Sequence, residues 1–569
     1  MRMINNLKGA KPPKVITDLR HLVSSGAENF GDRTLYFYKE RNGEYAEYSY
    51  TRLWEEMNRI GTAFSLLGIG DSHIAVSGDT HPRWIATYLA CVNGNGCIVP
   101  IDKELSDEAT ADFLKFGECV AFVYTAAQNG KARALAQNCP EIRYFIAIEP
   151  DEDFRFDDRV YTIDEILEMG ERALAEGNDT YLNTELIMDQ MSALIFTSGT
   201  TGTSKGVMLS HKNLTAATNA SVLSMSYDDR NTFVSVLPPH HTYEITCGHL
   251  AIMDLGAQIF INDSLKHVLK NFKSFQPNAL MLVPLFVETM HKRIWDEVRK
   301  KGLEKQMRAL IKMNSALLAV RLDVRSKLFK QVNAAFGGNL KSIVCGGAPL
   351  SPDLIKDFYA FGITVLEGYG ITECAPLVSV NSPGKIKFHS VGTPVKGCTV
   401  MIDKEPEDET GEILVKGDNV MMGYYKNPEA TAEVFTEDGW FRTGDIGYMD
   451  EDGYIFITGR KKNVIILSNG KNVVPEELEE YLATIPAILE SVVLARTNEA
   501  GDQTITAIVV PNDEILGGKD KDEIYAEIKA AVNNINRKLP SFKQIRKIEV
   551  RTERFERTTS KKIQRFKVN

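Results

Sequence analysis

A short run of small, hydroxylated residues between two apolar strands constrains this chain more than any other feature. Residues 197–206 read Thr-Ser-Gly-Thr-Thr-Gly-Thr-Ser-Lys-Gly and follow a strand predicted at 192–196. The glycines let the backbone turn tightly and approach a ligand closely. Successive N–H groups, the hydroxyls and Lys205 together form a cradle for an anion. The segment therefore predicts a polyphosphate site, but not a kinase-type P-loop, because Gly206 follows the lysine.

The residues before this segment predict alternating helices and strands. Residues 52–67 carry apolar side chains at helical spacing. Short apolar strands are predicted at 73–77, 96–101, 120–124 and 144–148. This order is typical of an α/β body in which helices cover a sheet. The chain has 569 residues, and one core rarely serves more than about 250–300, so we expect a multi-lobed body and a further domain.

A change of composition after residue 460 predicts that further domain. Residues 391–456 read as short strands broken by turns, whereas the later residues are rich in Lys and Glu. Helices are predicted at 475–484 and 522–538, and strands at 491–495 and 504–510. We therefore predict a large N-terminal domain of mixed sheets and helices over 1–460, a smaller α+β domain over 461–569, and a hinge at 459–463.

Charge and cysteine content exclude several classes of protein. A net charge of −10 is unsuited to a general nucleic-acid binder, which needs a basic surface. The eight cysteines are scattered without zinc-ligand spacing, which favours buried thiols in a reducing compartment. No apolar run approaches the roughly 20 residues that span a membrane, and the first residues lack the apolar core of a signal peptide. We therefore expect a cytoplasmic protein.

The phosphate segment resembles a family signature. Thr-Ser-Gly-Thr-Thr-Gly-Thr-Ser-Lys-Gly matches the signature of the adenylate-forming superfamily, which includes acyl-CoA synthetases, luciferases and the adenylation domains of peptide synthetases. Further signatures follow in the family's order over most of the chain. The resemblance implies that ATP activates a carboxylic acid. It places the phosphates on Thr197, Ser198, Gly199, Thr200, Thr201, Gly202 and Lys205.

The segment 237–244, Leu-Pro-Pro-His-His-Thr-Tyr-Glu, resembles the family's second signature. In that signature a histidine and a following aromatic residue lie beside the acid that is activated. His241 and Tyr243 occupy the matching positions, and we interpret His240 as structural.

Two glycine-rich segments predict the adenine site. Residues 345–349 follow an apolar strand at 342–344, and a Gly-Gly turn there lets the backbone approach a flat ring. In similar proteins this segment lies on adenine. Tyr369 offers a stacking face, Thr372 can donate to a phosphate, and Glu373 suits Mg²⁺ held jointly with substrate phosphates. The predicted nucleotide contacts are Gly347, Ala348, Pro349, Gly368, Tyr369, Gly370 and Thr372.

The C-terminal third carries the remaining family signatures. Asp445 matches the carboxylate that binds the ribose hydroxyls, Arg460 matches the arginine at the domain hinge, and Lys462 is the pivot. Asn469-Gly470 signals a hairpin turn, and in similar enzymes this hairpin enters the site for the second half-reaction. Lys562 matches the essential C-terminal lysine. Relatives usually have Gly at the position of the adjacent Lys561, so both lysines stay candidates at this point.

These matches imply a two-step reaction that uses ATP and Mg²⁺, with coenzyme A as the acceptor. Lys562, Thr197, Lys205, His241, Glu373 and Gly470 are the predicted catalytic residues. In the first step, the acid and ATP form an acyl-adenylate and pyrophosphate. The resemblance implies that the C-terminal domain is a mobile lid, which then turns about Lys462. In the second step, a thiol displaces AMP. The chain looks most like the AMP-forming long-chain fatty-acyl-CoA synthetases, which implies a medium- or long-chain fatty acid.

Three alternatives stay open. The thiol acceptor can belong to an acyl-carrier protein instead of CoA. The acid can be an amino or aryl acid, for which Glu244 is a candidate partner of the amine. A non-catalytic acyl-binding protein is the third, against which the intact signatures count.

A basic helical segment predicts a surface contact. Residues 292–330 hold twelve Lys or Arg against four acids, interleaved with apolar residues. A cationic, partly amphipathic helix attracts anionic lipids, so we expect this segment to meet a membrane surface, unless it is only a solvated helix face.

Overall fold

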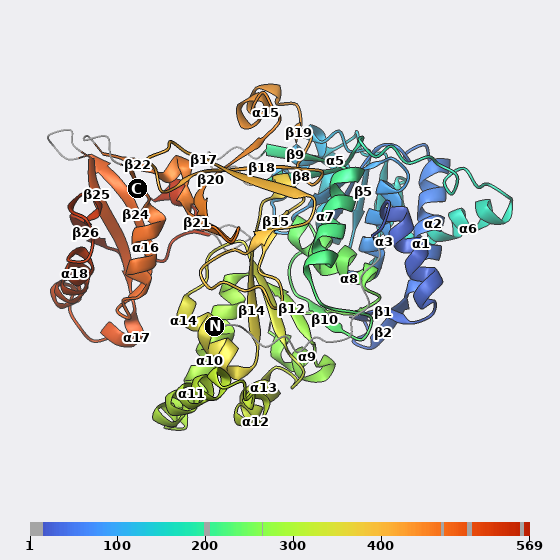
Figure 1. Cartoon of the computed structure of the whole chain (residues 1–569). Coiled ribbons are helices and arrows are strands. Elements are labelled where there is room, and N and C mark those ends of the chain that lie inside the picture. The colour runs from blue at the N-terminus through green and yellow to red at the C-terminus, as the bar shows by residue number, and fades with distance from the viewer. Residues whose placement is uncertain are drawn as a thin grey trace. The chain divides into compact units, whose positions relative to one another are not determined.

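The computed structural model describes residues 15–197, 205–264, 266–467, 472–497, 503–557 and 563–568. The chain forms two compact units, drawn in Figure 1. Unit 1 comprises Met1–Thr197, Ser204–Thr399 and Lys416–Glu433, and unit 2 comprises Ser198–Thr203, Val400–Val415 and Val434–Asn569. This division follows compactness alone, so the predicted domain boundary at 460/461 stays a prediction.

Unit 1 is built on two large sheets, and the first has nine strands in the order β16-β15-β14-β13-β12-β10-β11-β1-β2. Its strands β10 to β14 and β1 run parallel where they pair, while β2, β15 and β16 add antiparallel edges. The strands are β1 Thr34–Lys39, β2 Tyr45–Ser49, β10 Thr232–Ser235, β11 Gln258–Ile261, β12 Ala279–Leu282, β13 Ser342–Gly346, β14 Thr364–Gly370, β15 Leu377–Val380 and β16 Thr393–Pro394.

The second sheet has eight strands in the order β19-β9-β8-β4-β3-β5-β6-β7. Strands β3 to β7 pair in parallel, and β8 and β9 form the antiparallel arms on either side of the phosphate segment. The strands are β3 His73–Ser77, β4 Cys97–Ile101, β5 Ala121–Tyr124, β6 Tyr144–Ala147, β7 Val160–Thr162, β8 Met191–Thr197, β9 Lys205–Ser210 and β19 Gly423–Tyr424.

The two sheets share one topology in their parallel parts. In the first sheet the chain passes from β10 to β11 on one side, then crosses to β12 on the other side and continues outward. In the second sheet it passes in the same way from β3 to β4, then to β5 and outward. The direction in which successive strands are added therefore reverses between β10 and β12 in the first sheet, and between β3 and β5 in the second. In open α/β sheets, ligands bind beyond the carboxyl ends of the strands at such a reversal. The loops after β10 and after β3, β4 and β5 are therefore the first places to look for a site.

Helices cover both sheets, and helix α7 contacts strands of each of them. Its start is encoded locally: Ser210 accepts a hydrogen bond from the Asn213 N–H, while the Asn213 side chain accepts one from the Ser210 N–H. Ser210 is therefore the N-cap of α7. The helices of unit 1 are α1 Leu19–Phe30, α2 Tyr50–Leu66, α3 Pro82–Val92, α4 Asp107–Phe116, α5 Asn129–Asn138, α6 Ile163–Ala175, α7 His211–Ser224, α8 Ala251–Asp254, α9 Val268–Phe275, α10 Pro284–Lys300, α11 Glu304–Ala319, α12 Arg325–Leu328, α13 Lys330–Ala335, α14 Pro352–Phe361 and α15 Pro428–Val434.

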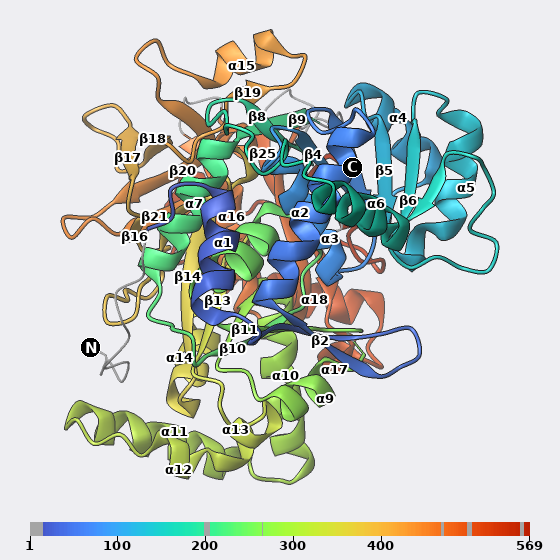
Figure 2. The same cartoon turned by 90° about the vertical axis from the view of Figure 1, so that its right-hand side faces the viewer.

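The basic segment at 292–330 is helical, but it is not one helix. It spans the end of α10, all of α11 and all of α12. Gly302 lies in the left-handed region at φ 66°, which ends α10 and lets the chain turn. Figures 1 and 2 show helices α10 to α13 gathered together at one end of the first sheet.

Unit 2 contains three smaller sheets in the orders β17-β18-β20-β21, β22-β23 and β24-β25-β26. The helices α16 and α18 contribute Leu478, Leu482, Ile528 and Val532 to an apolar core with β24 and β25. This mixture confirms the α+β character predicted for the C-terminal part. The elements are β17 Cys398–Asp403, β18 Gly411–Gly417, β20 Phe441–Met449, β21 Ile455–Arg460, β22 Ile465–Ile466, β23 Asn472–Val473, α16 Pro475–Ala483, β24 Ile488–Thr497, β25 Gln503–Pro511, α17 Asp513–Leu516, α18 Lys521–Asn536 and β26 Lys547–Val550.

All eight cysteines are buried free thiols, as their scattered spacing predicts. Within the described part of the chain, no helix combines the length and the apolar character that crossing a membrane requires.

Candidate active site

The loop after β10 carries His241 and leads into a π-helix, Tyr243–Leu250. Such helices are rare and often lie at functional sites. The Tyr243 hydroxyl donates a hydrogen bond of 3.0 Å to the carbonyl of Val344 in β13, one residue before the first adenine segment. The Thr246 hydroxyl donates one of 3.1 Å to the Ala375 carbonyl, just beyond Glu373. The acid signature and the π-helix that follows it thus contact the chain just before the first adenine segment and just after the second.

The two adenine segments lie side by side, because Gly346 of β13 pairs with Gly368 of β14. Gly347 adopts φ 97°, a backbone conformation that favours glycine, and the following Ala348 and Pro349 are exposed. A side chain at Gly370 would lie 2.2 Å from the Pro376 carbonyl oxygen. The glycines therefore allow two strand ends to pack closely. These are the strand ends that we predict to contact the adenine ring.

Tyr369 is largely buried, with 7% of its surface exposed. It pairs with Ser379 in the ladder between β14 and β15. Its predicted stacking on adenine stays a prediction.

The phosphate segment is described at its two ends only. Thr197 closes β8 and pairs with Lys205, which opens β9, and the Thr197 hydroxyl donates to the Lys205 carbonyl at 3.4 Å. The residues predicted to contact phosphate between them, Ser198, Gly199, Thr200, Thr201 and Gly202, lie outside the described residues. The antiparallel arms confirm the strand predicted at 192–196 and the return strand after the loop.

Tyr424 connects the phosphate segment to Glu373. The Lys205 amine lies 4.5 Å from the centroid of the Tyr424 ring, a cation–π contact. The Tyr424 hydroxyl donates a hydrogen bond of 2.9 Å to Glu373 Oε1. The Met421 N–H also donates to the Glu373 carbonyl at 2.8 Å. Sequence reasoning did not find Tyr424; strand β19 places it beside β9, a long-range pairing with no local signal.

Glu373 fits the predicted magnesium ion. Among the described residues, no cluster of three or more His, Cys, Asp or Glu could hold a metal by itself. Mg²⁺ does not need such a cluster, because it binds through one or two carboxylates and completes its coordination with phosphates and water. Glu373 is half-buried in a short helical turn, Thr372–Cys374, and shares Tyr424 with Lys205 at the end of the phosphate segment.

Glu244 is a buried acid that faces inward from the π-helix. It accepts hydrogen bonds from the Ser235 hydroxyl and the Leu237 N–H, and burial raises its pKa to about 8. His249 lies 3.7 Å from its carboxyl, and burial lowers the His249 pKa to about 3. Glu244 is therefore neutral at pH 7 and bound to the loop that carries His241. This argues against its role as a charged partner for a substrate amine.

Replacing this acid is expected to change how stability depends on pH. The pKa of Glu244 rises from 4.5 to about 8 on folding, so its stabilising neutral form is complete below pH 4.5 and is lost as pH rises to 8. Relative to the wild type, Glu244→Gln should gain stability over that window, by up to about 5 kcal/mol. Thermal unfolding midpoints of both proteins between pH 5 and 8 test this, with exposed Glu429→Gln as the control. A wild-type-to-variant difference that does not change with pH contradicts it.

Unit 2 contains the predicted ribose and hinge residues. Asp445 is buried in β20 and pairs with Arg460 across the ladder to β21, with 2.6 Å between the Arg460 Nε and Asp445 Oδ1. Lys462 follows Arg460 by two residues. Partial burial, with Arg460 and Arg565 nearby, lowers the pKa of Lys462 to about 8. The structure thus places the three predicted residues together, and their roles stay predictions.

Gly470 and Lys562 lie outside the described residues, but the chain on either side of each is described. Strands β22 and β23 pair antiparallel around the predicted hairpin, with Ile465 opposite Val473. Arg557 and Ile563 form an antiparallel bridge around the segment that carries Lys562. The described residues on either side of each predicted position are therefore paired with one another.

Comparison with known proteins identifies the family. A model described as AMP-binding enzyme matches residues 23–425, and one described as AMP-binding enzyme C-terminal domain matches residues 462–569. The chain belongs to the AMP-binding enzyme family. The predicted adenylate-forming superfamily is confirmed, as are the likeness to long-chain fatty-acyl-CoA synthetases and the class of AMP-forming acid–thiol ligase.

The relatives are distant but cover most of the chain. The chain is 26% identical to the chloroplastic long-chain-fatty-acid–[acyl-carrier-protein] ligase AEE15 of Arabidopsis thaliana, over 91% of this chain and 79% of the relative. It is 28% identical to the long-chain-fatty-acid–CoA ligase ACSBG1 of Bos taurus, over 84% of this chain and 68% of the relative. Its fold resembles ATP-bound MatB from Rhodopseudomonas palustris, with a TM-score of 0.74 and 22% identity over 97% and 98% of the two chains. The predicted fold class is confirmed.

Proposed function

We propose that this enzyme activates a medium- or long-chain fatty acid as an acyl-adenylate and passes the acyl group to the thiol of coenzyme A. The observation that carries this proposal is the contact chain from Lys205 through Tyr424 to Glu373, beside strand ends that also hold the His241–Tyr243 loop. Groups suited to phosphate, metal and acid thus occur together in unit 1. The two fatty-acid ligases among the relatives support the choice of acid.

In the first step an oxygen of the fatty-acid carboxylate attacks the α-phosphorus of ATP. The bond from that phosphorus to the bridging oxygen breaks, and pyrophosphate leaves with the electron pair. Negative charge grows on the phosphoryl oxygens, which Lys562, Lys205 and the N–H groups of the phosphate segment stabilise in this proposal. Mg²⁺ held by Glu373 would neutralise phosphate charge. Asp445 and Arg460 bind the ribose side of the nucleotide.

In the second step the thiol sulfur attacks the acyl carbonyl carbon of the adenylate. The bond from that carbon to the AMP oxygen breaks, AMP leaves with the electron pair, and the thiol proton passes to solvent. This step needs different groups, so we propose that the C-terminal domain turns about Lys462 and brings Gly470 to the thiol. Enzymes that need different catalytic groups in successive steps commonly exchange them by a hinge motion of a domain.

An acyl-carrier protein is the second candidate acceptor. The observation that favours it is the match to the Arabidopsis thaliana ligase, whose name gives an acyl-carrier protein as its acceptor and which covers 91% of this chain. The chemistry of both steps is unchanged, because both acceptors present a thiol.

One experiment tests the acid and the acceptor together. Acid-dependent AMP formation is measured with Mg-ATP for acids from acetate to oleate, with CoA, with a phosphopantetheinylated acyl-carrier protein, or with neither. We expect turnover to peak at long chains and to require CoA. Turnover only with the carrier protein moves the acceptor, and an absence of AMP with every acid rejects the proposal.

We also propose that the helical segment 292–330 meets an anionic membrane surface. Between its basic residues it exposes apolar side chains, of which Val320 is 73% and Leu322 52% exposed. Cations attract anionic headgroups, and exposed aliphatic side chains enter the interface. Sedimentation with phosphatidylglycerol vesicles, but not with phosphatidylcholine vesicles, is expected in the same assay mixture. The cytoplasmic location stays a prediction.

A further inference from the structure

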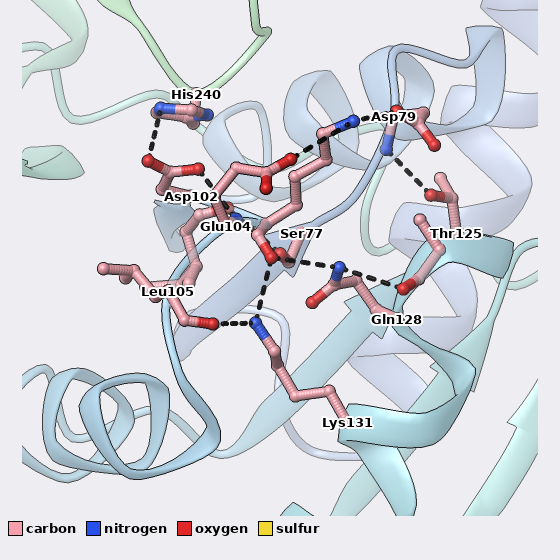
Figure 3. Close-up of polar contacts among 12 residues, drawn as sticks. Ser77, Asp79, Asp102, Glu104, Leu105, Thr125, Gln128, Lys131 and His240 are labelled. Carbon is pink, nitrogen blue, oxygen red and sulfur yellow. Dashed lines mark hydrogen bonds and ion pairs between the residues drawn. The ribbon is translucent and has the colours of Figure 1, made fainter. Parts of the chain in front are cut away.

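The carboxyl edge of the second sheet reaches the loop that carries the acid signature. Asp102 directly follows β4, and its Oδ2 lies 3.7 Å from His240 Nε2. Both side chains are largely buried, with 11% of His240 and 13% of Asp102 exposed. Figure 3 shows the two side chains facing each other. Asp102 is therefore the point at which the second sheet supports the loop after β10.

Asp102 is itself held firmly. Its Oδ1 accepts a hydrogen bond of 2.9 Å from the Glu104 N–H. The Lys131 amine donates to the Lys103 and Leu105 carbonyls at 3.1 and 2.6 Å, which ties the turn to the chain after β5, as Figure 3 shows.

The chain after β3 holds the same turn. The Lys103 amine lies 2.5 Å from Asp79 Oδ1, and the Asp79 N–H donates to the Thr125 hydroxyl at 2.9 Å. The ends of the three adjacent parallel strands β4, β3 and β5 thus fix the position of one carboxylate.

His240 transmits that position to its neighbour. The centroids of the His240 and His241 rings are 4.2 Å apart, with 48° between their planes. Burial, then the adjacent His241, lowers the pKa of His240 to about 3, so its ring is neutral at pH 7 and carries a single N–H. The 3.7 Å separation is an electrostatic contact rather than a hydrogen bond, and a carboxylate there favours the tautomer with the proton on Nε2.

We propose that Asp102 is a positioning residue, which orients the His241 ring for the fatty-acid carboxylate by holding the intervening His240 ring. The inference rests on the proposed function, because it needs His241 at the acid. Family resemblance points to His241 alone, whereas the position of Asp102 follows from the topology of the second sheet. Misplacing a contact group by about 1 Å can cost up to about 100-fold in rate, so the loss from Asp102 is measurable.

The test is a mutant cycle on the adenylation step. Asp102→Ala and His240→Leu are each expected to lower kcat/KM for the acid about ten-fold and to leave the KM for ATP unchanged. Asp102→Asn keeps an oxygen toward His240 and should stay near the wild type. Glu104→Gln is the matched control, because this exposed carboxylate neighbours the same turn without contacting His240.

The cycle separates a positioning role from a merely structural one. In the His241→Ala background, Asp102→Ala should cause no further loss, because its effect passes through the ring that is gone. Additive losses, or an unchanged kcat/KM for the acid in soluble Asp102→Ala, overturn the inference. If Asp102→Ala does not fold, His240→Leu carries the same test.

A crystal structure of Asp102→Ala gives an answer that needs no turnover. We expect a changed rotamer at His240 and a shifted ring at His241, and unchanged rings overturn the inference. Failure of the proposed function is a different result, an inactive wild type with every acid, and leaves this structural comparison intact.

Discussion

Lys562→Ala is expected to lower the rate of acyl-adenylate formation by about 10²–10³-fold, the range seen when one preorganised charge-stabilising donor is removed. The lysine is assigned to the charge that grows on the α-phosphate, which develops only in the first step. Thioester formation from a supplied acyl-adenylate should therefore stay near the wild-type rate. Acid-dependent pyrophosphate release measures the first step, and CoA consumption with synthetic oleoyl-adenylate measures the second.

The neighbouring Lys561→Ala is the matched control for this prediction. Both lysines carry the same charge in the same segment, and the family match favours Lys562 only by register. A larger loss from Lys561→Ala moves the assignment by one residue. Equal losses in both half-reactions would show that the lysine supports the fold or the acyl group rather than the phosphoryl transfer.

Described residues on either side of this segment are attached to the rest of unit 2. Before it, the Arg557 guanidinium lies 3.2 Å from the buried Glu490 carboxylate. After it, Arg565 donates 3.0 Å to the Val493 carbonyl and forms an ion pair with Glu479. These contacts tie both ends of the segment to unit 2.

Local patterns predicted the elements of the fold well. The strand expected at 73–77 has those bounds, and the helix expected at 475–484 ends one residue earlier. Both predictions depend on the short-range spacing of apolar residues, and the helix also begins with a proline. For the basic segment, the sequence predicts the helical character but not the breaks at Gly302 and after Ala319. The residues on either side of each break favour a helix equally, so the pattern does not show where the helices end.

The contacts between distant segments could not be predicted in the same way. Tyr424 reaches Lys205 and Glu373 only because β19 pairs with β9. Asp102 meets His240 only because the order of strands in the second sheet brings the end of β4 to the loop after β10. The sequence favours a structural role for His240, which stays a prediction, and the structure adds Asp102 as its partner.

The division into units shows a further limit. The described chain passes between the two units near residues 399, 415 and 433, so each unit combines segments that are separate in sequence. A shift in composition marks one boundary along the chain. It does not reveal that the chain leaves a unit and later re-enters it. The predicted catalytic residues Gly470 and Lys562 also lie outside the described residues, so family resemblance alone supports them.

Glu373→Gln should be the second most damaging change, lowering kcat/KM for Mg-ATP about 100-fold, because the amide keeps the shape of the side chain and removes its charge. A carboxylate is the hard oxygen ligand that Mg²⁺ prefers, and the phosphates supply the other ligands. If Glu373 holds the ion, a higher Mg²⁺ concentration should recover part of the loss. Initial rates of pyrophosphate release across a series of Mg²⁺ concentrations at fixed free ATP give the measurement.

Tyr424→Phe separates the charge of Glu373 from its hydrogen bond. This variant removes the 2.9 Å bond to Glu373 and keeps the aromatic ring beneath Lys205. A hydrogen bond to a charged group contributes about 1.5–3 kcal/mol, so a loss of at most about 10- to 150-fold, without a change in Mg²⁺ dependence, is expected. If Tyr424→Phe instead matches Glu373→Gln in size and in its response to Mg²⁺, the tyrosine orients the metal ligand itself. If Glu373→Gln shows no response to Mg²⁺, its role is in packing the strand ends and the metal assignment is wrong.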